Sequence, residues 1–326
     1  MSAINVAVVI VNYNTATLTL NAVASTLNKP HGGRSIAIHV VDNASPKGDF
    51  DVLMRAIADR GWASTVTLHA SALNVGFGSG NNMVLEKLAA PLPTYVFLLN
   101  PDAMLENDTI GILADFLDAH PGAAAAGAGI ANHEGVPVTA AFRFPGVLGT
   151  FAAALAFGPV SRLLRKWEVP LSPTTPTQPV GWVAGAAVMV RLEAMRRVGF
   201  FDPAYFLYYE EVDLMRQLSL QGGEIWHVAE ARVVHIEGAA TGVRSGHDSP
   251  KRLPAYWYES WRHYFMKNLG RTRAISAAAA WYMGAIGNTV LELLRGGRPQ
   301  TPKGFYGDFW RIAVRPLLGL RPLPYE

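Results

Sequence analysis

Short apolar segments alternate with amphipathic segments over the first 130 residues. The apolar segments are rich in β-branched residues and bounded by polar positions, so they predict strands. These predicted strands cover residues 4–11, 35–41, 65–69 and 94–99. Segments with helical spacing lie between or after them, at residues 14–27, 80–88 and 108–119. Strands that alternate with helices predict an α/β fold with a mostly parallel, doubly wound sheet.

Polar residues follow the ends of the predicted strands. Asn12, Asp42 and Asp102 come shortly after three of them, and Asn74 lies in the loop after another. Open α/β sheets bind ligands at the carboxyl ends of their strands. A turn or a helix cap explains any one of these residues equally well. Their occurrence in successive loops favours a ligand-binding edge.

The pattern is less regular after residue 130. The proline-containing segment 166–179 predicts a surface loop, and residues 182–190 an apolar strand. Further segments predict two helices and two short strands, at residues 192–198, 209–221, 224–228 and 232–235. Residues 238–254 are rich in Gly, Ser, Thr and Pro, which predicts a mobile loop that could close over a ligand.

Residues 274–291 form an uncharged run of 18 residues flanked by arginines on both sides. Its length is at the low end for a membrane span, and its alanines and glycines make its apolarity modest. Three interpretations remain open: a helix lying in the plane of a membrane surface, a buried helix of the fold, and a true span. The composition favours the first.

Composition limits the possible classes of protein. The chain has 326 residues, of which 50% are hydrophobic and 16% charged, so it can bury a large core and is too apolar for intrinsic disorder. Cysteine is absent, which excludes disulfides, a thiol nucleophile and a zinc–thiolate site. The mean hydropathy of +0.16 is high for a soluble enzyme and indicates that some apolar surface is used.

Charge is distributed unevenly along the chain. Residues 1–243 carry 15 Lys and Arg against 20 Asp and Glu, whereas residues 244–326 carry 13 against 5. An acidic body with a basic tail does not fit a nucleic-acid binder, but it fits a tail that touches an anionic membrane surface. We therefore expect a domain at 1–243 and a basic, partly apolar, helical region at 244–326. The first residues lack the basic start of a secretory signal.

Several familiar catalytic motifs are missing. The chain has no phosphate loop of the GxxxxGK[ST] type, no GxGxxG dinucleotide fingerprint, no G-x-S-x-G elbow and no HExxH motif. What remains at the end of an apolar strand is Asn100-Pro101-Asp102. A carboxylate there suits Mg²⁺ that is also held by substrate phosphates. The alternative is a turn in which Asp102 caps a helix.

An acidic cluster follows two tyrosines. Glu210, Glu211 and Asp213 lie within four residues, directly after Tyr208-Tyr209. Neighbouring like charges and apolar surface both raise a carboxyl pKa, as a general base requires. The alternative is an acidic first helical turn that is stabilised by the helix dipole. His235, at the end of a predicted strand, is a candidate metal or phosphate contact, although a lone histidine is more often structural.

Taken together, these motifs resemble family 2 glycosyltransferases, most closely the bacterial rhamnosyltransferase-like branch. The resemblance covers about residues 4–240 and rests on ordered motifs. They are Val11-Asn12-Tyr13-Asn14, Val41-Asp42-Asn43-Ala44-Ser45, Asn74-Val75-Gly76-Phe77-Gly78 with Asn81, Leu99-Asn100-Pro101-Asp102, Gly185-Ala186, Glu210-Glu211-Val212-Asp213-Leu214 and His235. The resemblance implies a GT-A fold, here with a C-terminal helical tail, a nucleotide-sugar donor, a divalent metal (Mg²⁺ or Mn²⁺) and inversion at the anomeric carbon.

The resemblance also implies roles for single residues on the donor side. Asn12 and Tyr13 would line the nucleoside pocket, and Asp42 would bond the pyrimidine base. The segment that passes beside the nucleotide and the donor sugar is matched by Asn74, Gly76, Phe77 and Asn81. Asp102 would bind the metal, with Asn100 in place of the family's first acid, and His235 would reach the metal or the diphosphate.

On the acceptor side, the family's usual Glu-Asp pair is Glu210-Glu211 here, so the catalytic base would be Glu211, one methylene longer than the common Asp. Glu210 and Asp213 complete the predicted catalytic cluster.

The expected function is therefore transfer of a sugar, with L-rhamnose from dTDP-rhamnose as the leading donor. The acceptor would be a glycan or a polyprenyl-linked glycan in cell-surface polysaccharide synthesis. This places the protein in the cytoplasm, peripheral at the inner face of the cell membrane, without a nucleic-acid partner. The alternatives are another donor, such as UDP-galactofuranose or UDP-GlcNAc, and a nucleotide-sugar-binding protein that does not catalyse transfer.

Overall fold

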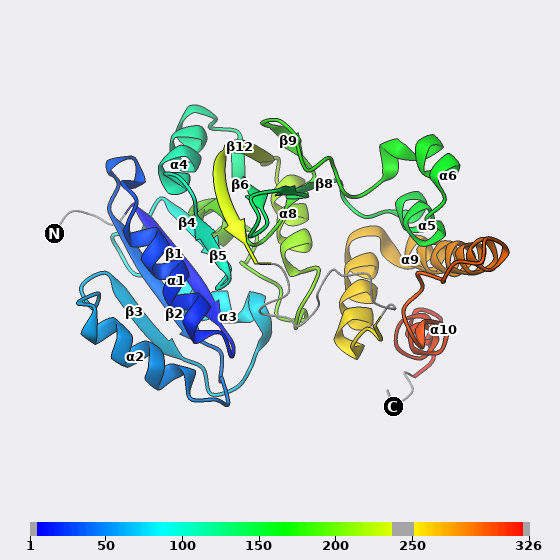
Figure 1. The fold of residues 1–326 in the computed structure, drawn as a ribbon, viewed down its shortest axis with the longest axis horizontal. Helices are drawn as coiled ribbons and strands as arrows, with labels where there is room; N and C mark the ends of the chain where they lie inside the picture. Colours follow the sequence, from blue (N-terminus) through cyan, green and yellow to red (C-terminus); the bar gives the residue numbers. More distant parts are fainter. Residues whose placement is uncertain (1–4, 237–250, 322–326) are drawn as a thin grey trace. The chain divides into compact units, whose positions relative to one another are not determined.

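The computed structural model describes residues 5–236 and 251–321 (Figure 1). The chain divides into two compact units. Unit 1 comprises Met1–Phe142, Leu171–Pro203 and Leu214–Ser245, and unit 2 comprises Arg143–Pro170, Ala204–Asp213 and Gly246–Glu326. Unit 2 thus groups the basic C-terminal region with two earlier segments. The boundary expected at 243/244 stays a prediction, and most of the predicted loop 238–254 lies outside the described residues.

Unit 1 is built on one large sheet with the strand order β3-β2-β1-β4-β11-β6-β12-β5. The first four of these are parallel: β3 (Val66–Ala70), β2 (Ile36–Asp42), β1 (Val6–Asn12) and β4 (Tyr95–Leu99). The other four are β11 (Ala187–Arg191), β6 (Ala123–Ala131), β12 (Glu224–His235) and β5 (Ala103–Leu105). Strand β11 runs antiparallel to both its neighbours, whereas β6 and β12 are parallel. The predicted α/β class with a mostly parallel sheet is confirmed.

Short strands extend this framework. Strand β7 (Pro137–Val138) pairs with β6, and β9 (Gln178–Val180) pairs with β12. Strands β8 (Ala141–Phe142) and β10 (Trp182–Val183) form a separate two-stranded sheet. The predicted strand 182–190 is therefore wrong as one element: it is divided between β10 and β11. The predicted strands 224–228 and 232–235 form the single strand β12, whose register with β6 shifts between Val228 and Arg232.

Helices cover both faces of the parallel strands. Successive residues of a strand point to opposite faces, and along β1 both sets are apolar and buried. Leu20 and Val23 of α1 (Ala16–Leu27) belong to the same core as Ile10, whereas Val11 faces Gly80 of α3 (Gly76–Leu85). The remaining helices of the α/β pattern are α2 (Asp49–Asp59), η1 (His31–Gly33), α4 (Thr109–Ala119) and α7 (Leu192–Arg197). The sequence pattern predicted a helix that starts at residue 80, but helix α3 begins at Gly76.

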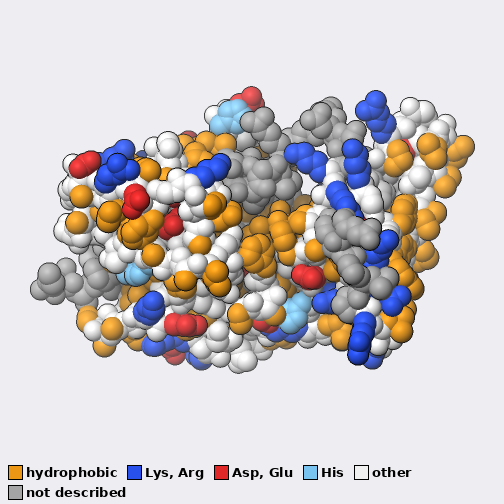
Figure 2. All heavy atoms as spheres, turned by 90° about the horizontal axis from the view of Figure 1, so that it is seen from below, with side chains coloured by type: hydrophobic (Ala, Val, Ile, Leu, Met, Phe, Trp, Pro, Cys, Tyr) orange, Lys and Arg blue, Asp and Glu red, His pale blue; other side chains and the backbone are white. Residues whose placement is uncertain are grey.

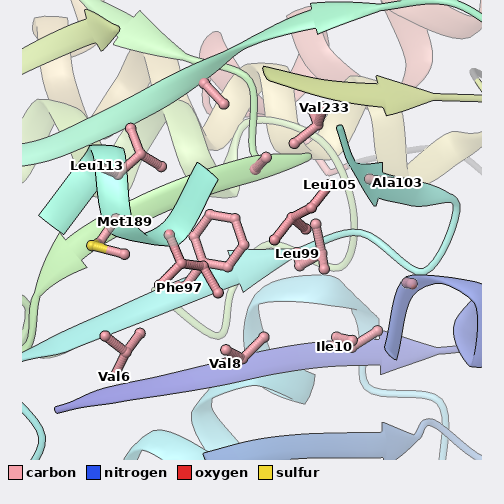
Figure 3. Packing of buried hydrophobic residues seen from close by; sticks show 14 of the residues in the cluster. Val6, Val8, Ile10, Phe97, Leu99, Ala103, Leu105, Leu113, Met189 and Val233 are labelled. Carbon is pink, nitrogen blue, oxygen red and sulfur yellow. The ribbon is translucent and has the colours of Figure 1, made fainter. Parts of the chain in front are cut away.

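The core of unit 1 lies where β1 and β4 pair (Figure 3). Val6, Val8 and Ile10 project from one face of β1, and Phe97 and Leu99 share that face on β4. All five are 0–1% exposed. Burying a side chain of this size contributes about 1.5–3 kcal/mol, so this row of residues fixes the register of the central strands.

Strand β6 is made almost entirely of alanine and glycine, in the sequence Ala123–Ala131. Its small side chains permit a close approach on one face, because a Cβ built on Gly127 would lie 2.4 Å from Cγ2 of Val183. Alanine is depleted in strands, which is why the hydrophobic pattern did not predict this one. Pairing with β11 and β12 on its two sides determines its conformation.

Unit 2 is helical. Its longest element is α9 (Ala255–Leu294), 40 residues with non-helical backbone at Gly270 (φ 79°, ψ 165°). Around it are α5 (Val147–Leu155), α6 (Gly158–Leu163), η2 (Arg165–Trp167), α10 (Phe305–Phe309), η3 (Trp310–Val314) and α11 (Arg315–Leu317). Helix α8 (Glu210–Leu220) begins in unit 2 and continues in unit 1 from Leu214.

The second half of α9 buries one side against α5. A Cβ on Gly284 would lie 2.7 Å from Cβ of Ala154, and Nδ2 of Asn288 donates to the Leu155 carbonyl over 3.3 Å. Within the described residues α9 is the one helix long and apolar enough to cross a membrane, a test that a core helix also passes. The three interpretations of residues 274–291 are therefore not separated by length and composition.

Candidate active site

One cluster of candidate residues lies at the ends of β1 and β2 in unit 1, where Asn12 is opposite Asp42. Nδ2 of Asn12 donates to Asp42 Oδ1 over 2.8 Å and to Asp49 Oδ2 over 3.0 Å. Its Oδ1 accepts from the hydroxyls of Thr15 and Thr19 at 3.1 and 2.8 Å. Asn12 is fully buried. Its side-chain amide therefore makes all these hydrogen bonds within the protein, and one of them fixes the orientation of the Asp42 carboxylate.

Asp42 itself is 4% exposed and is bound locally by Ser45. The Ser45 hydroxyl lies 2.5 Å from Oδ1, and the Ser45 N–H donates to Oδ2 over 3.3 Å. Tyr13, the residue directly after β1, is 38% exposed. At this point of the edge Tyr13 therefore presents an accessible aromatic surface beside a carboxylate of fixed orientation.

Asn43 connects this edge to the glycine-containing segment. Its Nδ2 donates to Asn74 Oδ1 over 2.9 Å and to the Gly76 carbonyl over 3.1 Å, and its Oδ1 accepts from the Val75 N–H over 3.1 Å. Oδ1 of Asn74 also accepts from the Gly76 N–H over 3.0 Å. Gly76 has φ 83°, a conformation that glycine adopts without steric cost. These bonds fix the start of α3.

The first turns of α3 are held from several sides. Gly78 lies so close to Phe201 that a Cβ would be 3.0 Å from Cβ of that residue. Nδ2 of Asn82 donates to the Phe201 carbonyl over 2.8 Å. Nδ2 of Asn81 donates to the Phe77 carbonyl over 2.9 Å, while its buried Oδ1 has no hydrogen-bond partner within residues 5–236 and 251–321. A buried polar atom of this kind is costly unless a ligand or water supplies a donor.

The two predicted metal ligands, Asp102 and His235, contact each other just after the end of β4. Nε2 of His235 lies 3.0 Å from Asp102 Oδ1, and the Asp102 side chain is 2% exposed. The pairing of β12 with β5 produces this contact, since His235 is opposite Ala103. The turn is fixed by Asn100, whose N–H donates to the Ala186 carbonyl and whose carbonyl accepts from the Ala103 N–H.

The donors at this point fit a divalent cation. A carboxylate oxygen and an imidazole nitrogen are both metal-binding groups, and Mg²⁺ or Mn²⁺ takes its further ligands from substrate phosphates and water. In the described part of the chain, no group of three or more His, Cys, Asp or Glu side chains is gathered in a way that could hold a metal. The protein thus offers a partial set of ligands.

A separate cluster of candidate residues lies in unit 2, at the start of α8. Tyr208 and Tyr209 both have φ 70°, the left-handed conformation. This conformation costs roughly 1–2 kcal/mol at each non-glycine residue, so two in succession are unusual. The Tyr209 carbonyl accepts from the Asp213 N–H over 2.8 Å, which closes the first turn. This strained turn places Glu210 and Glu211 at the N-terminus of the helix.

The two glutamates are neighbours in the chain, and Glu210 is buried while Glu211 is half-buried. Burial raises the pKa of Glu210 well above its ordinary value, and the neighbouring Glu211 charge raises it further. Burial also raises the pKa of Glu211, opposed by hydrogen bonds from the N–H groups of Glu211 and Val212. Oε2 of each glutamate is buried and has no hydrogen-bond partner among the described residues. A carboxylate with a raised pKa and an unpaired oxygen suits a general base.

Asp213, the third acid of the predicted cluster, has different surroundings. Its Oδ2 lies 2.6 Å from Nζ of Lys267, and its Oδ1 accepts from Nδ2 of Asn268 over 2.7 Å. Both partners come from α9. Through these two contacts, Asp213 attaches the start of α8 to α9 within unit 2. Because Lys267 compensates its charge, Asp213 is less suited than Glu211 to accept a proton.

Comparison with known proteins identifies the family. The model of the family described as "Glycosyltransferase like family 2" matches residues 4–250. The chain belongs to glycosyltransferase family 2. The match extends through the strand-end residues, the acidic cluster and His235. This confirms the resemblance seen in the motifs and makes the protein a glycosyltransferase.

Two curated relatives of this glycosyltransferase are rhamnosyltransferases. The chain is 27% identical over 220 residues to the N-acetylglucosaminyl-diphospho-decaprenol L-rhamnosyltransferase of Mycobacterium tuberculosis, covering 64% of this chain and 69% of the relative. It is 27% identical over 165 residues to rhamnosyltransferase WbbL of Escherichia coli, covering 49% of this chain and 60% of the relative. The chain thus spans about two thirds of the length of these relatives.

Solved structures show the same fold. GalNAc-T7, crystallised with UDP, GalNAc and Mn²⁺, has a TM-score of 0.59 at 15% identity over 99% of this chain and 59% of that chain. Mannosyltransferase PcManGT of Pyrobaculum calidifontis, solved with GDP-Man and Mn²⁺, has a TM-score of 0.53 at 16% identity, over 92% of this chain and 78% of that one. TarS of S. aureus has a TM-score of 0.54 at 13% identity, over 98% and 83%. The expected GT-A-type fold is confirmed.

Several residues that contact the candidate site residues were not predicted. Asn43 is inside one of the quoted motifs, and its position after β2 was the available signal. Asp49 begins α2 and carried no signal of its contact with Asn12. Lys267 and Asn268 lie in a basic, helical stretch of the C-terminal region, where nothing in the local sequence indicates a partner at Asp213.

Proposed function

We propose that this glycosyltransferase inverts the anomeric carbon of its donor and that Glu211 is the general base. The observation that carries the proposal is the glutamate pair at the start of α8, in which each residue has a raised pKa and one buried carboxylate oxygen without a hydrogen-bond partner in the described part of the chain. Such a group holds a proton more tightly than a solvated glutamate, which brings its pKa closer to neutral pH, where general bases work best.

The donor is held by residues of unit 1. Asp42 bonds the pyrimidine base, and Tyr13 packs on the nucleoside. Asn12 acts through Asp42, since its own amide is occupied. The segment that begins with Asn74 and continues into α3 passes beside the nucleotide and the sugar, with Gly76, Phe77 and Asn81.

The diphosphate is held at Asp102, His235 and the adjoining turn at Asn100. The two side chains fit a divalent cation, Mg²⁺ or Mn²⁺, in donor type and in spacing. When bound, such a cation offsets the negative charge that develops on the departing diphosphate. Asp102 supplies the carboxylate ligand, and His235 a second ligand or a hydrogen bond to phosphate.

The reaction is a single in-line displacement. The acceptor hydroxyl oxygen forms a bond to the anomeric carbon while the bond from that carbon to the diphosphate oxygen breaks. The hydroxyl proton passes to the Glu211 carboxylate, and the nucleoside diphosphate departs with the electron pair. Glu210 lies beside the base as a positioning residue, and Asp213 positions the turn through its contact with Lys267.

The names of the curated relatives support the choice of substrates. Both are rhamnosyltransferases, so we propose L-rhamnose from dTDP-rhamnose as the donor. The name of the mycobacterial relative supports a polyprenyl-diphosphate-linked glycan as the acceptor, in the synthesis of a cell-surface polysaccharide. UDP-galactofuranose and UDP-GlcNAc remain alternative donors, and a protein that binds nucleotide sugars without transferring them is the alternative function.

The C-terminal region supports a peripheral membrane location on the cytoplasmic side. Residues 251–321 carry 12 Lys and Arg against 3 Asp and Glu. On α9 a stripe of apolar side chains is 50–65% exposed and recurs every three or four residues: Met283, Ile286, Val290 and Leu293. Figure 2 shows Lys and Arg among hydrophobic side chains in the region of α9 and α10, at the right of the view. Anionic lipid suits this combination.

The test uses the full chain with a panel of nucleotide sugars, with and without Mn²⁺. Binding of the correct donor raises the thermal midpoint, so dTDP-rhamnose with Mn²⁺ is expected to give the largest shift. A larger shift with a UDP-sugar would move the proposal to that donor. Donor hydrolysis in the same samples separates an enzyme from a binding protein, which would raise the midpoint without releasing nucleoside diphosphate.

A further inference from the structure

Three aromatic side chains gather beside the acidic segment, and we call them the aromatic shelf: Phe206, Tyr208 and Tyr256. The ring centroids of Phe206 and Tyr256 are 5.2 Å apart, and Tyr208 stacks on Tyr256 at 6.1 Å with 23° between the ring planes. Phe206 is 38% exposed, and the two tyrosines are half-buried. The shelf is therefore an accessible aromatic surface.

The shelf differs from the aromatic core of the same unit. Trp261, Phe265 and Phe309 pack against one another with centroids 4.5 and 4.8 Å apart and are 0–1% exposed. Those rings account for the stability of unit 2, because burying each large aromatic side chain is strongly favourable. The rings of the shelf also pack on one another, but they remain partly exposed.

The two tyrosines of the strained turn have different surroundings. Tyr209 is anchored in the aromatic core, with its ring 5.8 Å from Trp257 and 5.3 Å from Tyr264. The ring of Tyr208 instead stacks on that of Tyr256 and so belongs to the shelf. Just before them, the Leu207 carbonyl accepts from the Ser260 hydroxyl of α9 over 3.0 Å. Strain that is held in place by surrounding contacts is a frequent feature of functional sites.

The shelf and the candidate base share one support. Tyr208 is three residues before Glu211 in the same segment of unit 2, and Tyr256 belongs to the first turn of α9. The same helix holds the turn through Lys267, whose Nζ is bonded to Asp213. The position of the shelf relative to Glu211 is therefore fixed within unit 2.

We propose that the aromatic shelf binds a saccharide ring of the acceptor and so delivers its hydroxyl to Glu211. This deepens the proposed function and rests on it. One face of a sugar ring is lined with C–H groups and packs on aromatic rings, while its edge carries hydroxyls. Tyrosines suit such a ring, because they offer a flat apolar body and a polar end. A prenyl chain would use the apolar surface alone.

The test compares Tyr256→Ala and Phe206→Ala with Tyr256→Phe. The matched control is Trp310→Ala, because Trp310 is 42% exposed in the same unit but lies outside the shelf. The acceptor probes are N-acetylglucosaminyl-diphospho-polyprenol and the same sugar diphosphate on a short alkyl chain. The readouts are acceptor KM, kcat, acceptor binding by calorimetry, and donor hydrolysis without acceptor.

The proposal expects both alanine variants to raise KM and weaken binding by about tenfold for both probes, with donor hydrolysis unchanged. Tyr256→Phe, which keeps the ring but loses the hydroxyl, is expected to weaken acceptor binding less than Tyr256→Ala, and Trp310→Ala is expected to stay near wild type. An unchanged KM in the alanine variants would overturn the proposal. A loss confined to the long-chain probe would assign the shelf to lipid, and a parallel loss of donor hydrolysis would make it structural.

Failure of the proposed base gives a different result. Glu211→Gln is expected to lower the transfer rate by about 10²–10⁴-fold while still binding both acceptor probes in calorimetry. If Glu211→Gln turns over normally while Tyr256→Ala still weakens acceptor binding, the base is wrong and the shelf stands.

Discussion

Lys267 and Asp213 form an ion pair, 2.6 Å from Nζ to Oδ2, in which the aspartate is 2% exposed and the lysine side chain 32%. The aspartate follows the two candidate catalytic glutamates in the first turn of α8. The lysine belongs to α9 and lies outside the residues matched by the family model. The candidate base is therefore held in part by the C-terminal region.

Lys267→Met is expected to destabilise the protein and lower transfer. Breaking a buried ion pair costs about 3–5 kcal/mol, and we expect less here because Asn268 still bonds Asp213 and Lys267 is partly exposed. Urea unfolding measures the loss, with the exposed Lys303→Met as control. The double variant Asp213→Asn/Lys267→Met should lose less than the sum of the single variants. Equal stability of Lys267→Met and wild type would show that the pair contributes nothing.

Glu211→Gln is expected to lower the transfer rate by about 10²–10⁴-fold, the usual contribution of a general base. Glutamine keeps the size of the side chain but cannot take the acceptor proton, so donor affinity should stay unchanged in calorimetry. Glu211→Asp should retain partial activity. Glu210→Gln is expected to affect binding or stability more than the chemical step.

The comparison with Asp213→Asn locates the base. Because Asp213 is paired with Lys267, its amide variant should keep far more activity than Glu211→Gln. A dead Asp213→Asn or Glu210→Gln beside an active Glu211→Gln would place the base elsewhere in the cluster.

The raised pKa values of Glu210 and Glu211 predict a dependence of stability on pH. A carboxyl whose pKa is higher in the folded than in the unfolded protein contributes stability below the unfolded value, about 4.3 for Glu. That contribution is lost as the pH rises toward the folded value. Glu210→Gln removes one of these groups. The thermal midpoint of this variant, relative to that of the wild type, should therefore rise as the pH increases from about 4 to neutral.

The same shift affects catalysis. Since the base must be ionised, the acid limb of the kcat profile should lie above the ordinary range of a glutamate. An acid limb near pH 4 in the wild type, or an unchanged profile of thermal midpoints in Glu210→Gln, would contradict this prediction.

Asp102→Ala is expected to abolish metal-dependent donor binding and leave the fold intact. The carboxylate lies at the strand end and its contact is with His235, so its loss removes a ligand and little packing. The measurement is the thermal shift by donor with and without Mn²⁺. Wild-type transfer that persists in excess chelator, or a normal Mn²⁺-dependent shift in Asp102→Ala, would remove the metal role.

Replacing Ile286 and Leu293 of the α9 stripe with serine is expected to reduce co-sedimentation with anionic vesicles. These side chains are 53% and 65% exposed, so folding should be little affected. The control replaces Val52 and Met54, which are 41% and 49% exposed in unit 1. High salt should weaken binding of the wild type, because the attraction of basic residues to lipid is screened. Equal sedimentation of all three proteins would exclude this stripe as the contact.

The sequence predicted the elements whose pattern is set locally. Strands β1 and β4 were evident because their residues are apolar on both faces, and helix α4 because its apolar spacing is regular. Strand β6 was not, since its alanines form a strand only through pairing with β11 and β12. Local pattern cannot show a conformation that is imposed by neighbours.

The candidate site divides in the same way. Motifs close in sequence, such as Asn100-Pro101-Asp102 and Glu210-Glu211, could be recognised from their residues and order. Partners distant in sequence could not: the contact of Lys267 with Asp213 depends on how α9 packs, which no local pattern encodes. The strained turn at Tyr208 and Tyr209 was also invisible, because tyrosine gives no sign of a left-handed backbone.

The grouping of residues 204–213 with the C-terminal helices bears on how such enzymes diverge. A chimera that exchanges residues 251–321 between two relatives would replace the scaffold of the acidic turn and one of the three rings of the aromatic shelf, while every strand-end residue of the sheet stayed the same. Acceptor preference could then change during evolution without changes at the donor edge. An alignment that stops at residue 250 would miss that inheritance, because it includes the glutamates of α8 and omits α9, whose Lys267 pairs with Asp213.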